Sequence, residues 1–262
     1  ELSRPKGGVA GSNPAGDSRR NRLLRWGSSS FGRLFLKRSI LSSMPINPTF
    51  EYEEIYWRQN IPFVAGLDEA GMGALAGPVT AAAVIWDQQS SISNFQSSNV
   101  AVRDSKTLSA GQREKAVKWI REHALAWAVG EATVVEIDEL NMRNASHLAM
   151  RRAINALNHP LELLLIDGAP AQIHDNVPTV NIINGDALSF SIAAASILAK
   201  VHRDEIMTQL DMQFPSYGFA SHKGYGSKQH LDALREHGAS EYHRTSYAPV
   251  ASVLTKSRKS IS

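Results

Sequence analysis

Apolar residues along this chain fall into short runs that alternate with polar turns and with segments of helical spacing. Each apolar run has the length of a buried strand. The predicted strands are residues 63–67, 79–86, 127–135, 161–166 and 180–183. Three strands in succession, followed by helices that alternate with strands, predict one mixed α/β domain.

Serine or asparagine residues that can cap a first turn mark the starts of the predicted helices. Ser109 and Gln112 form a capping-box pattern at the first start. Gly238, a residue type common at helix ends, closes the last helix. The predicted helices begin at Ser109, Asn144, Ser189 and Ser227, and the middle two run to about Leu157 and Leu210. Residues 87–102 are rich in Ser, Gln and Asn and are predicted to form a solvated loop.

The composition is that of an ordinary globular protein, with 43% hydrophobic and 20% charged residues in 262. No apolar stretch reaches the roughly 18 residues of a transmembrane helix. The absence of cysteine excludes disulfides and thiolate metal sites and is consistent with a reducing compartment. We therefore expect a cytoplasmic protein with no membrane association, and we expect it to be a monomer.

The net charge of +3 comes from the amino-terminal segment. Residues 1–43 carry a local charge of +7, which leaves −4 for residues 44–262. The first segment is rich in Ser and Arg, and we expect it to be a disordered extension. Sequence upstream of a start at Met44 is favoured over a transit peptide. The expected catalytic domain is residues 44–262, and its overall charge gives no argument for nucleic-acid binding.

Acidic residues closely follow several of the predicted strands: Asp68, Glu69, Asp167 and Asp186. Folding these strands into one sheet would bring the four carboxylates to the same edge, where they would repel one another. Divalent cations relieve such repulsion, and Mg²⁺ or Mn²⁺ prefers carboxylate oxygens. Each acid taken alone fits an ordinary solvated turn, so the predicted metal site depends on the four together.

Seven sequence blocks in this chain resemble, in order, the signature of bacterial ribonuclease HII. They are residues 66–78 (GLDEAGMGALAGP), 104–108 (DSKTL), 166–168 (IDG), 185–186 (GD), 191–204 (SIAAASILAKVHRD), 222–225 (HKGY) and 243–244 (HR). The resemblance implies a ribonuclease H-like fold, in which helices flank a central mixed five-stranded sheet and a helical extension follows at the carboxyl end.

The resemblance also implies an activity. Such an enzyme cuts the RNA strand of RNA/DNA hybrids, and cuts 5′ of single ribonucleotides in duplex DNA, leaving 3′-hydroxyl and 5′-phosphate ends. It thereby removes misincorporated ribonucleotides. By position, Asp68 would bridge two Mn²⁺ or Mg²⁺ ions, and Asp186 would help to hold the ion that activates water. Glu69 and Asp167 would hold the other ion.

The resemblance further implies a set of substrate contacts. The turn formed by Gly71, Met72 and Gly73 would let the main chain approach the ribose 2′-hydroxyl. Tyr225 would pack on the sugar next to the cut. The candidate phosphate contacts are Lys106 and Lys223 first, then Lys200, Arg203 and Arg244. For Lys200 and Arg203 the alternative is a role in packing and ion pairing. His222 and His243 are expected to be structural and not metal ligands.

Met72 departs from the usual Gly-Arg-Gly of the family and predicts weaker substrate binding. A related hybrid-specific ribonuclease without activity at single ribonucleotides is therefore the first alternative. A nucleic-acid-binding protein without catalysis is the second, although the four acids are intact. A purely structural protein is the weakest alternative, because it gives the acids no role.

Overall fold

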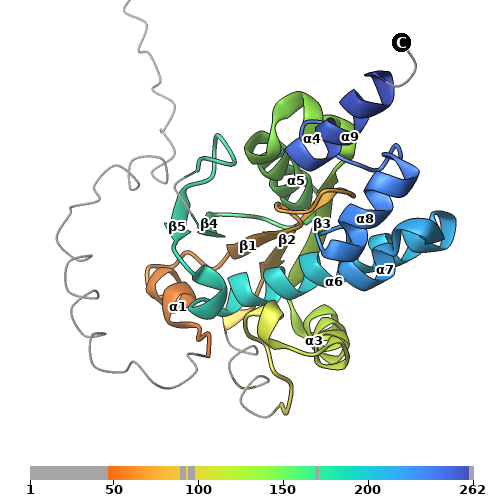
Figure 1. The fold of residues 1–262 in the computed structure, drawn as a ribbon. Helices are drawn as coiled ribbons and strands as arrows, with labels where there is room; N and C mark the ends of the chain where they lie inside the picture. Colours follow the sequence, from red (N-terminus) through yellow and green to blue (C-terminus); the bar gives the residue numbers. More distant parts are fainter. Residues whose placement is uncertain (1–46, 89–92, 94–97, 169–170, 260–262) are drawn as a thin grey trace, which may run out of the picture. The chain divides into compact units, whose positions relative to one another are not determined.

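The structure is a computed structural model that describes residues 47–88, 93, 98–168 and 171–259 (Figure 1). These residues fall in one compact unit, Ile46–Ser262. The predicted extension 1–43, the predicted domain start at residue 44 and part of the predicted loop 87–102 lie outside the described residues.

A single five-stranded sheet forms the centre of this unit, in the order β3-β2-β1-β4-β5 (Figure 1). The strands are β1 (Val64–Ala70), β2 (Val79–Ile85), β3 (Ala126–Ala132), β4 (Leu163–Asp167) and β5 (Thr179–Ile182). β1, β2 and β3 pair antiparallel, whereas β4 lies parallel to both β1 and β5. The predicted mixed five-stranded sheet is thus confirmed.

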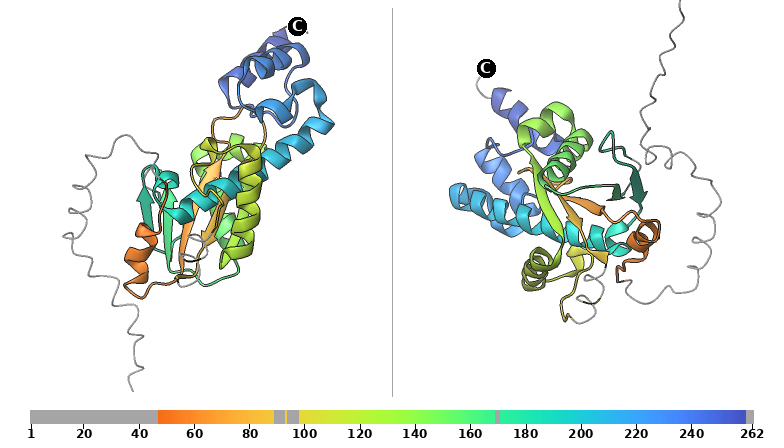
Figure 2. Two further views of the ribbon diagram at one scale, coloured as in Figure 1. Left: turned by 90° about the horizontal axis from the view of Figure 1, so that it is seen from below. Right: turned by 180° about the vertical axis from the view of Figure 1, so that it is seen from behind.

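Helices cover both faces of the sheet and continue past it (Figure 2). The longer ones are α3 (Ala110–His123), α5 (Met142–Ala156), α6 (Phe190–Gln213), α8 (Lys228–His237) and α9 (Ala248–Lys259). The shorter ones are α1 (Glu51–Trp57), α4 (Val134–Leu140), α7 (Phe219–His222) and the 3-10 turns η3 (Ser105–Thr107), η4 (Gly185–Ala187) and η5 (Pro215–Tyr217). Helices α7 to α9 confirm the predicted carboxyl-terminal helical extension. None of the helices in the described ranges is long and apolar enough to cross a membrane.

Alternation along the strands divides the core into two layers. Val64 and Leu163 face the layer that contains α1, α3 and the first half of α6. Their neighbours Ala65 and Leu164 face the layer that contains α5. The close approach of α6 to β1 depends on Gly66, because a Cβ there would lie 2.3 Å from the carbonyl carbon of Ser191.

Two predicted boundaries are wrong for local reasons. The third strand does not extend to residue 135, because Thr133 and Glu136 form a capping box that starts α4. The helix predicted to start at Asn144 is capped one turn earlier, since the Asn141 side chain accepts a hydrogen bond from the Asn144 amide. The first cap ends the predicted strand early, and the second starts the predicted helix early.

Candidate active site

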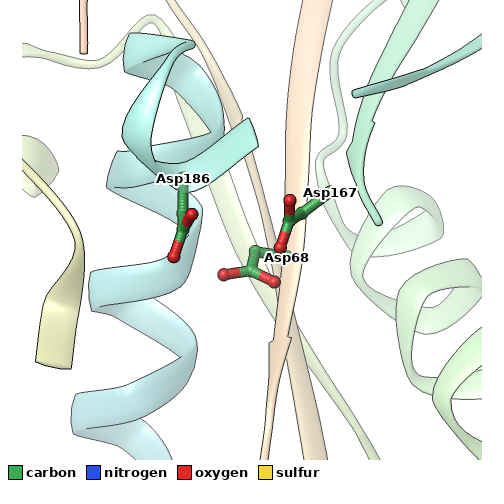
Figure 3. A group of neighbouring side chains, drawn as sticks. All are labelled: Asp68, Asp167 and Asp186. Atoms are coloured by element: carbon green, nitrogen blue, oxygen red, sulfur yellow. The ribbon is translucent and has the colours of Figure 1, made fainter. Parts of the chain in front are cut away.

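Three of the predicted acids come together at one edge of the sheet. Asp68 lies on β1, Asp167 ends β4 and Asp186 lies on η4. One carboxylate oxygen of each lies within 4.8 Å of the other two, and the side chains point toward one another (Figure 3). The parallel pairing of β1 with β4 and of β4 with β5 brings these segments to the same edge.

The sequence predicted that Asp68 and Glu69 follow the first strand. In the structure both residues lie within β1. β1 continues to Ala70 because Glu69 and Ala70 still pair with Ala81 and Thr80 of β2. Successive side chains on a strand point to opposite faces. Glu69 is not one of the three acids whose oxygens lie within 4.8 Å of one another, although the charge of Asp167 acts on its carboxylate and its amide donates a 2.7 Å hydrogen bond to Asp68 Oδ1.

The turn that carries Asp186 is tied directly to Asp167. The Gly185 amide donates a 2.6 Å hydrogen bond to Asp167 Oδ1. Asn184, with φ 56°, reverses the chain before this turn. A Cβ on Gly185 would lie 2.6 Å from Ile192 Cδ1, so the turn also packs closely on α6. These contacts fix the separation of the two carboxylates.

Burial and neighbouring carboxylates raise the pKa values of Asp68, Glu69 and Asp186. Burial, together with the charges of Glu69 and Asp167, raises the pKa of Asp68 well above its usual range. Burial and Asp167 raise the pKa of Glu69 to about 7, and burial and Asp167 also raise the pKa of Asp186. Lys106 opposes the shift at Glu69 and at Asp186, which places its charge near the site. A partly buried set of oxygen donors with excess negative charge fits a divalent cation.

A hydroxyl that the sequence analysis missed supports Asp68. Ser196, buried on α6, forms a hydrogen bond with Asp68 that lowers the pKa of that carboxyl. Its Oγ lies 3.1 Å from Ser105 Oγ, which links Asp68 to the turn that carries Lys106. The available signal was a serine inside an otherwise apolar helical run, where a buried hydroxyl requires a partner.

Two buried arginines hold the glycine turn that follows β1. Arg203 donates to the carbonyls of Ala76, Pro78 and Lys223, and Arg244 donates to those of Met72, Gly77 and Pro78. Gly71 has φ 99°, and a Cβ there would lie 2.1 Å from Arg203 Nε. Both guanidinium groups are fully buried. The prediction that they contact phosphate is therefore wrong, and the packing alternative stated for Arg203 is confirmed.

The other predicted substrate contacts differ in their surroundings. Tyr225 is 38% exposed, and a Cβ on Gly73 would lie 4.0 Å from its Cε1. Lys106 is exposed, whereas Lys223 Nζ donates a 2.9 Å hydrogen bond to Thr208 Oγ1. Lys200 forms an ion pair with Asp204 on α6, which confirms the pairing alternative for that lysine.

Glu53 on α1 is buried below the first turn of α6 and gives a prediction about stability. Its Oε1 accepts hydrogen bonds from the Ser189 hydroxyl at 2.6 Å and the Ser191 amide at 2.9 Å, and burial raises the pKa of Glu53. A carboxyl whose pKa is raised by folding stabilises the fold below its unfolded value and loses that contribution as the pH rises through the folded value. Glu53→Gln should therefore gain stability relative to the wild type between pH 4.5 and pH 8, by on the order of 1 kcal/mol.

Urea unfolding of both proteins across this pH range measures the difference. Glu51→Gln, an exposed position on the same helix, is the matched control and should show no such pH-dependent gap. A gap that stays constant with pH for Glu53→Gln would contradict the buried-charge explanation.

Solved ribonucleases H share this fold. Ribonuclease H2 from Pyrococcus horikoshii OT3 matches with a TM-score of 0.64 at 25% identity, over 75% of this chain and 99% of that one. Bst-RNase HIII, solved in complex with Mn²⁺, matches with a TM-score of 0.58 at 18% identity, over 76% of this chain and 71% of that one. The chain thus has a ribonuclease H-like fold.

The family follows from the sequence comparisons. The model of the family "Ribonuclease HII" matches residues 65–250. Ribonuclease HII of Acidovorax sp. (strain JS42) is 51% identical over 191 residues, which are 73% of this chain and 88% of that protein. The chain belongs to the ribonuclease HII family, which confirms the resemblance seen in its sequence blocks, and its activity is that of a ribonuclease H.

Proposed function

We propose that this chain cuts the RNA strand of RNA/DNA hybrids and also cuts duplex DNA on the 5′ side of single ribonucleotides. The products carry 3′-hydroxyl and 5′-phosphate ends, and the activity removes misincorporated ribonucleotides from DNA. The observation that carries the proposal is the convergence of Asp68, Asp167 and Asp186 next to the turn formed by Gly71, Met72 and Gly73.

The metal requirement is part of the same proposal. Two divalent ions, Mn²⁺ or Mg²⁺, would be held by Asp68, Glu69, Asp167 and Asp186. The raised pKa values of Asp68, Glu69 and Asp186 support this assignment, since such groups bind a cation in exchange for protons. When bound, the ions lower the pKa of water and stabilise charge on the departing oxygen. Asp68 is the most buried of the three convergent acids and lies on the central strand, as suits a ligand shared by both ions.

We assign the selection of RNA over DNA to the glycine turn and the residues near it. The main chain of Gly71 and Gly73 would recognise the 2′-hydroxyl, which is the group that distinguishes RNA from DNA. Tyr225 would pack on the neighbouring sugar from its place beside Gly73. Lys106 and Lys223 would contact phosphates, Lys106 from the η3 turn near the acids and Lys223 from the end of α7.

A panel of three labelled substrates tests the proposal with the full chain and Mn²⁺ or Mg²⁺. The substrates are a DNA duplex with one ribonucleotide, a long RNA/DNA hybrid and an all-DNA duplex. Cuts 5′ of the single ribonucleotide and within the hybrid, with no cut in all-DNA, are the expected pattern. Cleavage of the hybrid alone would favour the hybrid-specific alternative, and no metal-dependent cleavage of either RNA-containing substrate would overturn the proposal.

Met72 is the specific observation that supports the hybrid-specific alternative, and it gives a second prediction. Its side chain is 41% exposed, while its carbonyl is held by Arg244 and by the Tyr247 hydroxyl. Replacing the side chain should therefore leave the turn in place. Met72→Arg would add a cation beside the substrate backbone and should lower KM for the single-ribonucleotide duplex about threefold to tenfold, with kcat little changed.

Steady-state kinetics at two salt concentrations measure this effect. Met212→Arg, at an exposed methionine near the end of α6, is the matched control for added charge. An unchanged or higher KM for Met72→Arg would contradict this prediction, as would an equal decrease in KM for Met212→Arg.

A further inference from the structure

Three histidines that the proposed function does not use gather in the carboxyl-terminal helical part. The rings of His222 and His230 stack with centroids 4.4 Å apart, and the Nε2 atoms of His230 and His243 lie 3.1 Å apart. His230 and His243 are buried and pack around Phe219. The expectation that His222 and His243 are structural agrees with these contacts, but the hydrogen bonds show a more specific arrangement.

The main-chain partners fix which nitrogen of each ring carries the proton. The Ser240 amide can only donate, and it lies 3.0 Å from His243 Nδ1, so Nδ1 is the acceptor. The neutral ring then carries its proton on Nε2 and donates it to His230 Nε2. His230 in turn carries its proton on Nδ1, which donates to the Tyr225 carbonyl at 3.0 Å. The chain of hydrogen bonds therefore runs in one direction, from Ser240 to Tyr225.

This direction requires both rings to be neutral, because two protonated Nε2 atoms cannot share one hydrogen bond. Burial lowers the pKa of His230, and burial with the neighbouring His230 lowers the pKa of His243 to about 4. This chain of hydrogen bonds is therefore intact near neutral pH, where a nuclease would be assayed.

The chain of hydrogen bonds ends at Tyr225, which lies beside the glycine turn. Tyr225 forms a bridge with Ala74, and the Gly224 carbonyl accepts a 2.8 Å hydrogen bond from Leu75. The Tyr225 ring lies over the Arg203 guanidinium, with 5.3 Å from Cζ to the ring centroid. A shift of the Tyr225 main chain would move this ring relative to Gly73.

We infer that His230, held in one tautomer by His243, is a positioning residue that fixes the Tyr225 main chain and so places its ring to receive the ribose next to the cut. The inference rests on the proposed function, in which Tyr225 contacts that sugar. His230 itself touches no reacting atom and acts only through Tyr225.

Two amide substitutions at one position provide the test. In His230→Asn, the side-chain amide nitrogen stands near the place of Nδ1 and can still donate to the Tyr225 carbonyl. In His230→Gln, it stands near the place of Nε2 and faces His243. The Gln variant should raise KM for the single-ribonucleotide duplex about tenfold with kcat changed less than twofold, which is the usual effect of one lost hydrogen bond. The Asn variant should keep KM within about twofold of the wild type.

A double-mutant cycle separates positioning from a general loss of structure. In the background of Tyr225→Ala, His230→Gln should raise KM no further, because the residue through which it acts is gone. Thermal melting of each variant checks that it is folded, and His230→Asn serves as the second variant if the Gln protein fails to fold. Equal KM values for the Asn and Gln variants, or additive effects in the cycle, would overturn this inference alone. No cleavage by the wild type would instead overturn the proposed function, and this inference with it.

Discussion

Asp68→Asn is expected to lower cleavage of the single-ribonucleotide duplex on the order of 10³-fold and to raise the thermal stability of the metal-free chain. The loss of activity follows because asparagine removes the carboxylate that the two proposed metal ions would share. A loss of this size is typical when one catalytic electrostatic group is removed. The gain in stability follows because the pKa of Asp68 is raised by burial and by Glu69 and Asp167. A neutral side chain of the same size removes that unfavourable charge.

The sign of the pH dependence adds a second check. A carboxyl with a raised folded-state pKa stabilises the fold at low pH and loses that contribution as the pH rises. The melting temperature of Asp68→Asn in EDTA should therefore exceed that of the wild type by several degrees at pH 8 and by less at pH 5. Added Mn²⁺ should raise the melting temperature of the wild type more than that of the variant.

Asp175→Asn is the matched control, since Asp175 is an exposed acid in the segment between β4 and β5. It should change neither cleavage nor the response to Mn²⁺. Retention of more than about a tenth of the wild-type rate by Asp68→Asn would contradict the assignment of Asp68 as a shared metal ligand. A lower melting temperature in EDTA would contradict the repulsion argument, because it would mean that the charged form is favoured in the fold.

The elements that place the acids could be predicted because burial leaves a local pattern in the sequence. Short apolar runs identified all five strands, and the acids near the ends of β4 and β5 followed from them. The end of β1 could not be predicted in the same way. Asp68 and Glu69 are polar, yet the strand continues through them to Ala70 because residues 80–82 of β2 supply pairing partners. That pairing is a property of the sheet and not of the segment.

The roles of the two arginines could not be predicted from the sequence, for a similar reason. A sequence shows that Arg203 and Arg244 are cationic but not that main-chain carbonyls of residues 72–78 surround them. An arginine is most often exposed, so an anionic partner outside the protein was the natural expectation. In the structure, both arginines instead donate to main-chain carbonyls that lie more than 120 residues away in the sequence. The glycine turn is thus held from within by two buried cations.

Arg244→Gln should have the largest effect on folding of the changes considered, because of this internal support. Arg244 Nε and a terminal nitrogen both donate to the Gly77 carbonyl, at 3.0 and 2.9 Å. Met72 O keeps a bond from Tyr247 and Pro78 O keeps one from Arg203, but Gly77 O loses both donors. Losing several bonds from a buried charged donor should cost roughly 3 kcal/mol or more, or about 6–12 °C in melting temperature.

Urea unfolding and melting of Arg244→Gln, Arg244→Lys and the wild type measure this cost. Lysine keeps the charge but not the planar fork, so it should restore only part of the loss. Arg235→Gln is the matched control, because Arg235 is an exposed arginine paired with Asp232, and it should change stability by less than about 0.5 kcal/mol. Since Arg244 also holds the carbonyl of Met72, the folded fraction of Arg244→Gln should show a raised KM for ribonucleotide-containing duplexes. A stable protein with unchanged KM would mean that the glycine turn keeps its shape without the guanidinium.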